Sequence, residues 1–316
     1  MNTEAREFGV LLASIALMVV LVFCTNGFFT QENLLDLFLS AMPVMIIAIG
    51  MTLIIITGHI DISIGSVFAL CSVVTGLCAA MGLSTVLSGV IACFVGALCG
   101  TFNGVLVSSL RIPSIVVTLA TMVIIRDGLR WKTQGAWVEG LPARFQWFGL
   151  PTAVYTVLCF FIVALLVLLS AFGLRYLRIG RTVFATGSNE AAARMTGINT
   201  GRVVLSVFTL TGFLTGLAAV LNATRFNQIP SNSGLGLELK VIAAVAVGGA
   251  VITGGSASIA GTVLGVILLS CISSALTYLG ISAYWEKAIQ GGIILIAIAI
   301  DAINLHRRQR ANAITV

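Results

Sequence analysis

Charged residues are scarce in this sequence. They make up 9% of its 316 residues, whereas hydrophobic residues make up 59%. A soluble globular domain carries about a quarter of its residues as charges. This shortage, together with a mean hydropathy of +1.11, excludes a soluble globule. It indicates a membrane protein that crosses the bilayer several times.

Histidine and lysine are also rare, and their scarcity removes several kinds of catalyst. His59 and His306 are the only histidines, and neither an H-E-x-x-H zinc motif nor a G-x-S-x-G nucleophile motif occurs. None of the lysines follows a glycine in the pattern of a phosphate-binding loop. The sequence therefore predicts that the chain is not an enzyme and does not itself hydrolyse ATP.

Two further features are interpreted as ordinary properties of a membrane protein. The net charge of +6 comes without a basic patch interleaved with aromatic residues, so we expect no nucleic-acid partner. The seven cysteines lie in or beside apolar runs without C-x-x-C spacing. We therefore expect them to pack as small apolar residues, with no disulfide framework, metal site or cofactor.

Apolar runs predict an all-α fold of about ten membrane-spanning helices, because each span needs about 20 apolar residues. Little polar sequence separates the spans at 57–64 and 253–259, so about eight to ten spans fit the pattern. We expect one transmembrane domain over 1–316, without a soluble domain between the spans. The expected spans are 9–23, 40–57, 64–82, 86–108, 113–130, 152–173, 203–222, 239–253, 259–279 and 284–304.

The distribution of arginine predicts the orientation of the chain in the membrane. Loops on the cytoplasmic side carry an excess of lysine and arginine. An arrangement with both termini inside places Arg6, Arg111, the loop at 174–202 and the arginines of 307–310 in the cytoplasm. We therefore predict that the N-terminus and the C-terminus are both cytoplasmic.

The loop at 174–202 is the one long polar stretch between apolar spans. It carries five arginines against a single acidic residue, Glu190. Its Glu-Ala-Ala-Ala-Arg-Met segment predicts a short helix that begins after Asn189 or Ser188 and ends at Gly197. Such a helix could connect a separate motor protein to the spans, and the alternative is a solvated basic loop.

A second polar segment, 58–66, lies between two spans. Its Asp61 and Ser63 have two compatible interpretations. Their side chains could cap the helix that follows, by accepting hydrogen bonds from its first free N–H groups. They could instead form a polar element beside a transport path or its gate. Asn103, inside a later span, is expected to make a polar contact near that path.

The segment at 100–105 with Ser109 is repeated at 261–266 with Ser270, with matching Gly, Thr, Gly, Val and Ser positions. In the predicted topology the two copies cross the membrane in opposite directions. This relation is typical of the inverted repeats that build transporters. The regularly spaced glycines also predict close helix packing.

An ion-coupled carrier would usually place ionisable side chains deep within its spans. The expected spans are nearly free of such residues: Asp61 and Asp301 lie at span ends, and Glu238 and Lys240 are interpreted as interfacial anchors or a surface for an external partner. Energy is therefore expected to come from another chain. A carrier driven by an ion gradient and a membrane scaffold without transport remain alternatives.

Four stretches together resemble the permease subunits of ribose-type ABC sugar importers. These stretches are 58–66, 100–104 with 111–119, 180–198, and 247–249 with 254–256. The resemblance implies a subunit of the bacterial inner membrane that forms the path for a small sugar-like solute. Its implied partners are two cytoplasmic ATPases, a second permease, identical or related, and a periplasmic solute-binding protein, in addition to membrane lipid.

The same resemblance implies roles for individual residues. The loop helix would be the coupling element seated on an ATPase, and ATP-driven closure would alternate access to the path. Coupling is assigned to Arg181, Asn189, Glu190, Arg194, Met195, Gly197 and Ile198, and the path or gate to Asp61, Ser63 and Asn103.

Within that family, 135–143, 228–230 and 283–285 look most similar to permeases for autoinducer-2, followed by those for rhamnose. His59 departs from the glycine or asparagine expected at its position, which leaves the substrate open.

Overall fold

The computed structural model describes residues 3–24 and 28–280, together with scattered positions from 282 to 296. Within these residues the fold is all-helical, as the sequence predicts. The only β pairing described there is an isolated bridge between Val138 and Ile229. The helices are α1 (Thr3–Cys24), α2 (Gln31–Ile56), α3 (Ile64–Ala80), α4 (Thr85–Ser108), α5 (Ser114–Thr133), the 3-10 turn η1 (Gln146–Gly149), α6 (Thr152–Tyr176), α7 (Arg178–Ser188), α8 (Glu190–Met195), α9 (Thr200–Ala223), α10 (Leu237–Val247) and α11 (Ile259–Tyr278).

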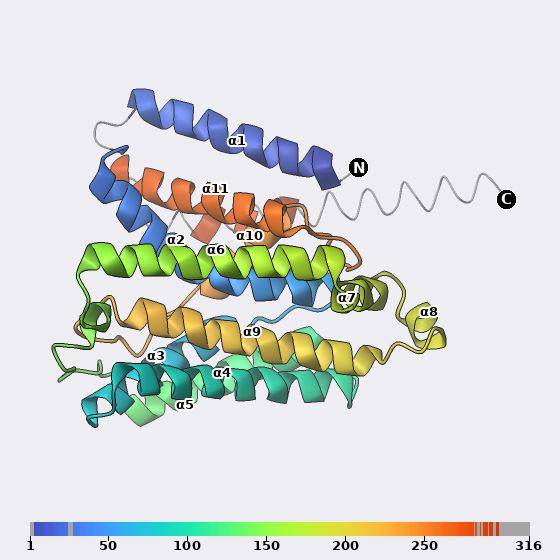
Figure 1. Cartoon of the computed structure of the whole chain (residues 1–316), viewed down its shortest axis with the longest axis horizontal. Coiled ribbons are helices and arrows are strands. Elements are labelled where there is room, and N and C mark those ends of the chain that lie inside the picture. Colours follow the sequence, from blue (N-terminus) through green and yellow to red (C-terminus); the bar gives the residue numbers. More distant parts are fainter. Residues whose placement is uncertain are drawn as a thin grey trace.

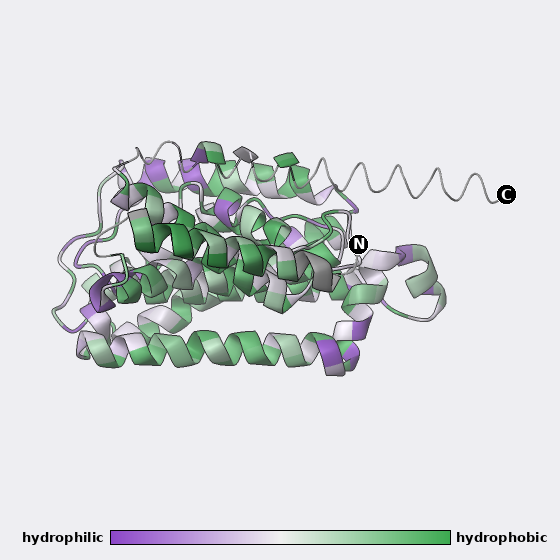
Figure 2. Cartoon of the chain, turned by 90° about the horizontal axis from the view of Figure 1, so that it is seen from above, coloured by the Kyte–Doolittle hydropathy of each residue, from purple (hydrophilic) through white to green (hydrophobic). Residues whose placement is uncertain are grey.

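Long helices lie side by side in a bundle, and α7 and α8 project from one end of it (Figure 1). Among the residues that the structure describes, five helices are long and apolar enough to cross a membrane: α2, α4, α6, α9 and α11. Shorter apolar helices occupy Phe8–Phe23 and Ile64–Ala80. Most hydrophilic residues lie toward the ends of the bundle (Figure 2). The chain is therefore a multi-pass membrane protein. The expected span at 284–304, with Asp301, lies largely outside the described residues.

The expected span at 239–253 is wrong in its extent, because α10 ends at Val247. Gly249 and Gly254 have φ values of +92° and +97°, a left-handed conformation that ends a helix and that glycine adopts without strain. The chain from 248 to 258 consequently runs through turns before α11 begins. Sequence hydropathy alone did not reveal this stop, because the residues around the glycines are apolar.

The centre of the bundle is α2. Buried residues make up 89% of its most apolar stretch, compared with 11% for α6. Since both helices are strongly apolar, the difference lies in their surroundings: α2 is enclosed by other helices, whereas α6 presents its side chains outward. An outward apolar face suits lipid contact. The core of the fold therefore forms around α2.

Glycine lets pairs of helices approach until their backbones touch. A Cβ on Gly100 of α4 would lie 2.2 Å from the carbonyl oxygen of Phe208, and one on Gly212 of α9 would lie 2.2 Å from that of Gly96. The second copy of the sequence repeat does the same, since a Cβ on Gly265 would lie 2.0 Å from the Ala244 oxygen. The predicted packing role of these glycines is confirmed.

Candidate functional site

A buried polar cluster forms where the link between α2 and α3 enters the bundle. One oxygen of Asp61, Oδ1, accepts hydrogen bonds from the backbone N–H and the hydroxyl of Ser63, at 2.8 and 2.6 Å. Asp61 is 2% exposed and Ser63 is fully buried. The carboxylate therefore closes a turn of buried backbone just before α3.

Asn103 connects this turn to two further helices. From α4, its Nδ2 donates to the Ser63 hydroxyl at 2.9 Å, and its Oδ1 accepts from the Thr121 hydroxyl of α5 at 2.7 Å. Asn103 is fully buried and Thr121 is 6% exposed. Each member of the cluster thus has a partner, as buried polar groups require. The cluster joins Asp61, Ser63 and Asn103, which the sequence indicated separately.

The helix-cap interpretation of Asp61 and Ser63 is wrong in its specific form. Ser63 occupies the N-cap position of α3 but makes no side-chain cap hydrogen bond. Asp61 accepts from Ser63 itself instead of from an N–H group inside α3. Thr121 was missed by sequence reasoning because a threonine in an apolar span gives no signal of its own.

A second polar contact crosses the bundle between α5 and α10. Arg126 Nη2 lies 3.6 Å from Glu238 Oε2, with side chains 22% and 9% exposed. Neither atom has a hydrogen-bond partner among the described residues. Gly65 of α3 makes the space, since a Cβ there would lie within 2.1 Å of the Glu238 oxygen. Glu238, in the first turn of α10, is thus directed toward Arg126 of α5.

The projecting element consists of α7 and α8. Asn189 Oδ1 accepts from the Ala192 N–H at 3.0 Å and so caps α8, and Gly197 follows the helix with a φ of +85°. The predicted short helix, its start after Asn189 and its end before Gly197 are confirmed. The preceding helix α7, Arg178–Ser188, which contains Gly180 and Gly187, was not predicted.

Hydrogen bonds attach α8 to the start of α9. Glu190 Oε1 accepts from Arg194 Nη2 at 2.5 Å and from the Thr200 hydroxyl at 3.0 Å, and Arg194 Nε donates to that hydroxyl at 2.9 Å. Although partial burial opposes it, these interactions hold the pKa of Glu190 below its ordinary value. The pair of Glu190 and Arg194 therefore sets the direction in which α8 projects.

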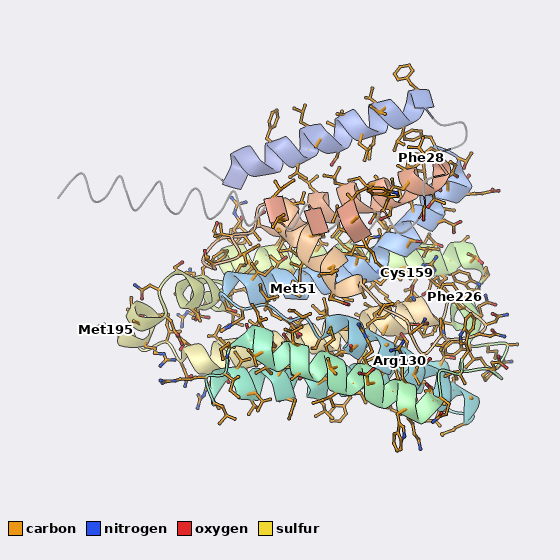
Figure 3. The ribbon with its side chains drawn as sticks, turned by 180° about the vertical axis from the view of Figure 1, so that it is seen from behind. Phe28, Met51, Arg130, Cys159, Met195 and Phe226 are labelled. Carbon is orange, nitrogen blue, oxygen red and sulfur yellow. The ribbon has the colours of Figure 1, made fainter. Side chains whose placement is uncertain are left out.

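The remaining predicted coupling residues lie along the exposed surface of this element. Met195 is 90% exposed and lies at the far tip of the projection (Figure 3). Arg181 and Gly197 are also exposed, and Ile198 is half-buried. An exposed apolar side chain at the tip, beside arginines, provides a surface that another protein could cover.

Glycines join the projecting element to the core. A Cβ on Gly187 of α7 would lie 1.6 Å from the carbonyl oxygen of Ile56, the last residue of α2. The same oxygen accepts a hydrogen bond from the Gly255 N–H at 2.9 Å. A Cβ on Gly254 would lie 2.9 Å from Gly58 Cα. We call the contact among Ile56, Gly58, Gly187 and 254–255 the glycine junction.

A polar cavity of about 430 Å³ lies beside this junction and includes His59, Arg111, Glu190 and Arg194 in its lining. Burial lowers the pKa of His59, and the negative charge of Glu190 opposes that shift. The histidine consequently links the α2–α3 segment electrostatically to α8. No group of three or more potential metal-ligating side chains occurs among the residues that the structure describes.

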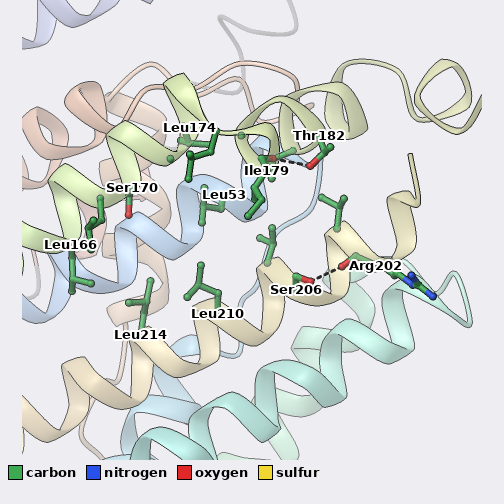
Figure 4. A pocket seen from close by; sticks show the side chains of 17 residues that line it. Leu53, Leu166, Ser170, Leu174, Ile179, Thr182, Arg202, Ser206, Leu210 and Leu214 are labelled. Atoms are coloured by element: carbon green, nitrogen blue, oxygen red, sulfur yellow. Dashed lines mark hydrogen bonds between the residues drawn. The ribbon is translucent and has the colours of Figure 1, made fainter. Parts of the chain in front are cut away.

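An apolar cavity of about 540 Å³ lies among α6, α7 and α9. Leu166, Leu174 and Leu210 contribute to its apolar lining (Figure 4). The hydroxyls of Thr182 and Ser206 in its wall donate to the backbone oxygens of Ile179 and Arg202. This cavity suits hydrocarbon better than a hydroxylated solute.

Two of the three stretches that resemble autoinducer-2 permeases lie together at the opposite end of the bundle from α8. Val138 and Ile229 exchange two backbone hydrogen bonds, of 2.9 and 3.1 Å, which join 135–143 to 228–230. Ala283 and Tyr284 of the third stretch lie outside the described residues.

The fold and these sites define a helical, multi-pass membrane protein with a projecting helical element. Residues 33–298 match the family model described as "Branched-chain amino acid transport system / permease component". The chain belongs to this permease family.

Similar relatives are autoinducer 2 import system permease proteins LsrC. Those of Yersinia pseudotuberculosis serotype O:3 (strain YPIII) and Yersinia enterocolitica are each 36% identical over 94% of this chain, covering 84% and 82% of the relatives. The protein of Escherichia coli O157:H7 is 35% identical over 98% of this chain and 93% of its own length. No solved structure matches.

Proposed function

We propose that this chain is the permease subunit of an ATP-driven importer for a small sugar-like solute, and that autoinducer-2 is the first substrate to test. The family match over 33–298 and the printed function of the LsrC relatives support this proposal most strongly. The capped and exposed helix α8 supports it independently, because a permease without its own ATPase needs a surface on which an ATPase can act.

The arrangement in the membrane belongs to the same proposal. The permease is a single domain with about ten spans and an inverted repeat, and it lies in the bacterial inner membrane with both termini in the cytoplasm. The arginines of 174–202 support this orientation because they lie in and around the projecting element. The assembly contains two ATPase subunits, a second permease and a solute-binding protein outside the membrane.

Coupling would begin at α8, whose exposed tip fits into a groove on the ATPase. Shape and apolar contact at Met195 contribute more than the exposed arginines, since a surface ion pair adds only about 0–1 kcal/mol. Movement of α8 reaches α9 through the bonds among Glu190, Arg194 and Thr200. It reaches α2 and the chain at 248–258 through the glycine junction.

The gate would lie where α2 passes into α3. Asp61, Ser63 and Asn103, with Thr121, hold the link 57–63 against α4 and α5 in the present conformation. The glycine junction lies directly before this link. A shift of α7 would therefore displace the backbone that carries Asp61. The buried hydrogen bonds would then rearrange and open or close the path.

The second candidate is a carrier driven by an ion gradient. The largely buried Arg126–Glu238 pair between α5 and α10 favours it, because buried ionisable groups in a membrane protein are typical of ion and proton pathways. The carrier has no need of α8 as a docking element, whereas the importer requires it.

Uptake of labelled autoinducer-2 and of labelled rhamnose separates the two candidates. The vesicles contain this permease with its partner permease, ATPase and binding protein, and uptake is compared with ATP, with a non-hydrolysable analogue, and after ionophores collapse the gradients. The importer predicts uptake that needs ATP hydrolysis and survives the ionophores. Uptake that ignores ATP and disappears with the gradients would establish the carrier.

A further inference from the structure

Residues of α2, α10 and α11 line a small polar cavity. The N-terminal part of α2, which contributes to it, lies at the end of the bundle remote from α8 (Figure 1). The volume of the cavity is about 290 Å³, and its lining includes Asn33, Asp36, Ser40, Lys240 and Ser270. On α11, hydroxyl residues at 270, 273, 274 and 277 line it, a spacing that places them on one helix face. We call this space the hydroxyl pocket.

One hydroxyl in the wall is left without a partner. Ser270 is 5% exposed, and its Oγ has no hydrogen-bond partner among the described residues. Its neighbour on the same face, Ser273, donates instead to the Leu269 carbonyl oxygen at 3.0 Å. A buried hydroxyl that forgoes its hydrogen bonds is unfavourable. A ligand that offers a donor or acceptor at this wall would remove that penalty.

The charges of the hydroxyl pocket balance and lie on different helices. Asp36 of α2 supplies a carboxylate acceptor, and Lys240 of α10 supplies an ammonium whose Nζ donates to the Ser273 hydroxyl at 2.9 Å. A carboxylate, an ammonium and several hydroxyls together offer both donors and acceptors. A solute with many hydroxyls satisfies such a wall. A purely apolar solute satisfies none of these groups, and a charged solute is attracted by one of the two charges and repelled by the other.

The size of the pocket limits the solute further. Ligand pockets commonly run from about 300 to 1,000 Å³, so a volume of about 290 Å³ suits one small ring. The cavity of about 540 Å³ among α6, α7 and α9 is larger and is lined mainly by apolar side chains. The polar cavity beside the glycine junction, of about 430 Å³, is larger and has Arg111, Glu190 and Arg194 in its lining, so the hydroxyl pocket is the smaller of the two polar cavities.

We propose that the hydroxyl pocket binds a small, uncharged, polyhydroxylated solute on its way into the membrane. The proposal rests on the proposed function, since it supplies that importer with a solute site in the permease itself. Ser270, Asp36 and Lys240 recognise the solute. The pocket lies at the end opposite to α8, so it would receive the solute before the gate at Asp61 opens.

The test measures solute binding directly, without the binding protein and without ATP. Ser274→Cys places a thiol in the pocket wall, and a membrane-impermeant maleimide labels it in the assembled complex, with wild-type labelling subtracted. Autoinducer-2 should slow this labelling in a saturable manner. Cyclohexane carboxylate, an anion without hydroxyls, should not slow it at the same concentration.

Two second-site variants in the Ser274→Cys protein provide the comparison. Ser270→Ala removes the unpartnered hydroxyl and should raise the half-protecting concentration of autoinducer-2 by about fivefold to tenfold. Ser72→Ala is the matched control, because Ser72 Oγ is equally buried and without a partner among the described residues but lies on α3, outside the pocket. It should leave that concentration unchanged.

Failure of this inference is distinguishable from failure of the proposed function. If vesicles take up autoinducer-2 with ATP but the solute never protects the thiol, the importer stands and the hydroxyl pocket is not its solute site. Equal effects of Ser270→Ala and Ser72→Ala would also overturn the assignment. Protection that depends on Ser270 supports the pocket even where uptake proves to be driven by an ion gradient.

Discussion

The buried polar cluster and the α8 attachment are built from similar hydrogen bonds in opposite surroundings. Asp61, Ser63 and Asn103 are at most 2% exposed, whereas the side chains of Arg194 and Glu190 are 44% and 56% exposed. A buried polar group that loses its partner pays its full desolvation cost, while an exposed one bonds to water. The cluster therefore fixes the bundle, and the attachment only orients a helix.

This difference in burial suits the buried polar cluster and the α8 attachment to different roles. A gate must hold one arrangement firmly until enough energy arrives to change it, and buried hydrogen bonds provide that resistance. A docking helix must adapt to its partner, and exposed bonds allow adjustment at low cost. Variants in the core should consequently change stability and transport together. Variants in α8 should change transport and leave stability almost intact.

The largest loss of stability is expected from Arg126→Leu. It leaves Glu238 buried opposite an apolar side chain, and removing one partner of a buried ion pair costs about 3–5 kcal/mol. Arg130→Leu is the matched control on the same helix, since its ion pair with Asp127 is 66% exposed on both sides and contributes about 0–1 kcal/mol. Thermal unfolding in detergent measures both, and equal losses would contradict the burial of the first pair.

Gly187→Ala should come next. Its Cβ would lie 1.6 Å from the Ile56 oxygen, and such overpacking costs about 1–3 kcal/mol. The change should also reduce transport more than ATPase association, because it displaces α7 from α2. Gly173→Ala in α6 is the control, where the nearest atom is 4.0 Å away. Indistinguishable stability and transport of the two variants would exclude the glycine junction as a rigid contact.

Asn103 and Thr121 should be coupled in a double-mutant cycle. Asn103→Leu removes the amide that donates to the Ser63 hydroxyl and leaves the Thr121 hydroxyl without its acceptor, at a cost of about 1–3 kcal/mol. Thr121→Val alone should cost less, and the double variant should cost less than the sum. Unfolding free energies of the four proteins give the interaction energy, expected at about 0.5–3 kcal/mol. Strict additivity would mean that the cluster does not act as a unit.

The smallest effect on stability is expected from Glu190→Gln. Because the folded pKa of Glu190 is lowered, its stabilising contribution is complete above the ordinary glutamate pKa of about 4.3 and is lost as pH falls through the folded value. In the wild type, the opening of α8 that hydrogen exchange of its amides reports should increase as the pH falls below that value. In Glu190→Gln, this opening should not change over the same pH range. Equal acid responses in the two proteins would assign the pH dependence to another group.

Local signals in the sequence predicted α8 well and its neighbour poorly. Asn189 and Gly197 are strong start and stop signals because their effect depends on adjacent backbone alone. Helix α7 was missed because glycines normally disfavour helices. Gly187 occurs in this helix because only a residue without a Cβ can pack against the Ile56 carbonyl oxygen. That contact joins residues far apart in the chain, so it leaves no local pattern.

The same distinction applies inside the bundle. The sequence indicated Asp61, Ser63 and Asn103 individually, since polar residues in apolar surroundings require a reason. It did not indicate that they share one network with Thr121, nor that Arg126 meets Glu238. Arg126 was visible within the expected span 113–130, and it should have prompted a search for an acidic partner.

The central claim, that α8 is the surface on which a separate ATPase acts, can be tested by site-specific cross-linking. Met195→Cys places a thiol at the tip of α8, where Met195 is 90% exposed, and Phe161→Cys, at a position 64% exposed on α6, is the control. A short bifunctional thiol reagent is applied to the reconstituted complex, followed by an uptake assay. Our account predicts that Met195→Cys cross-links to the ATPase and abolishes ATP-driven uptake, while Phe161→Cys does neither. Efficient cross-linking at Phe161 and none at Met195 would contradict it.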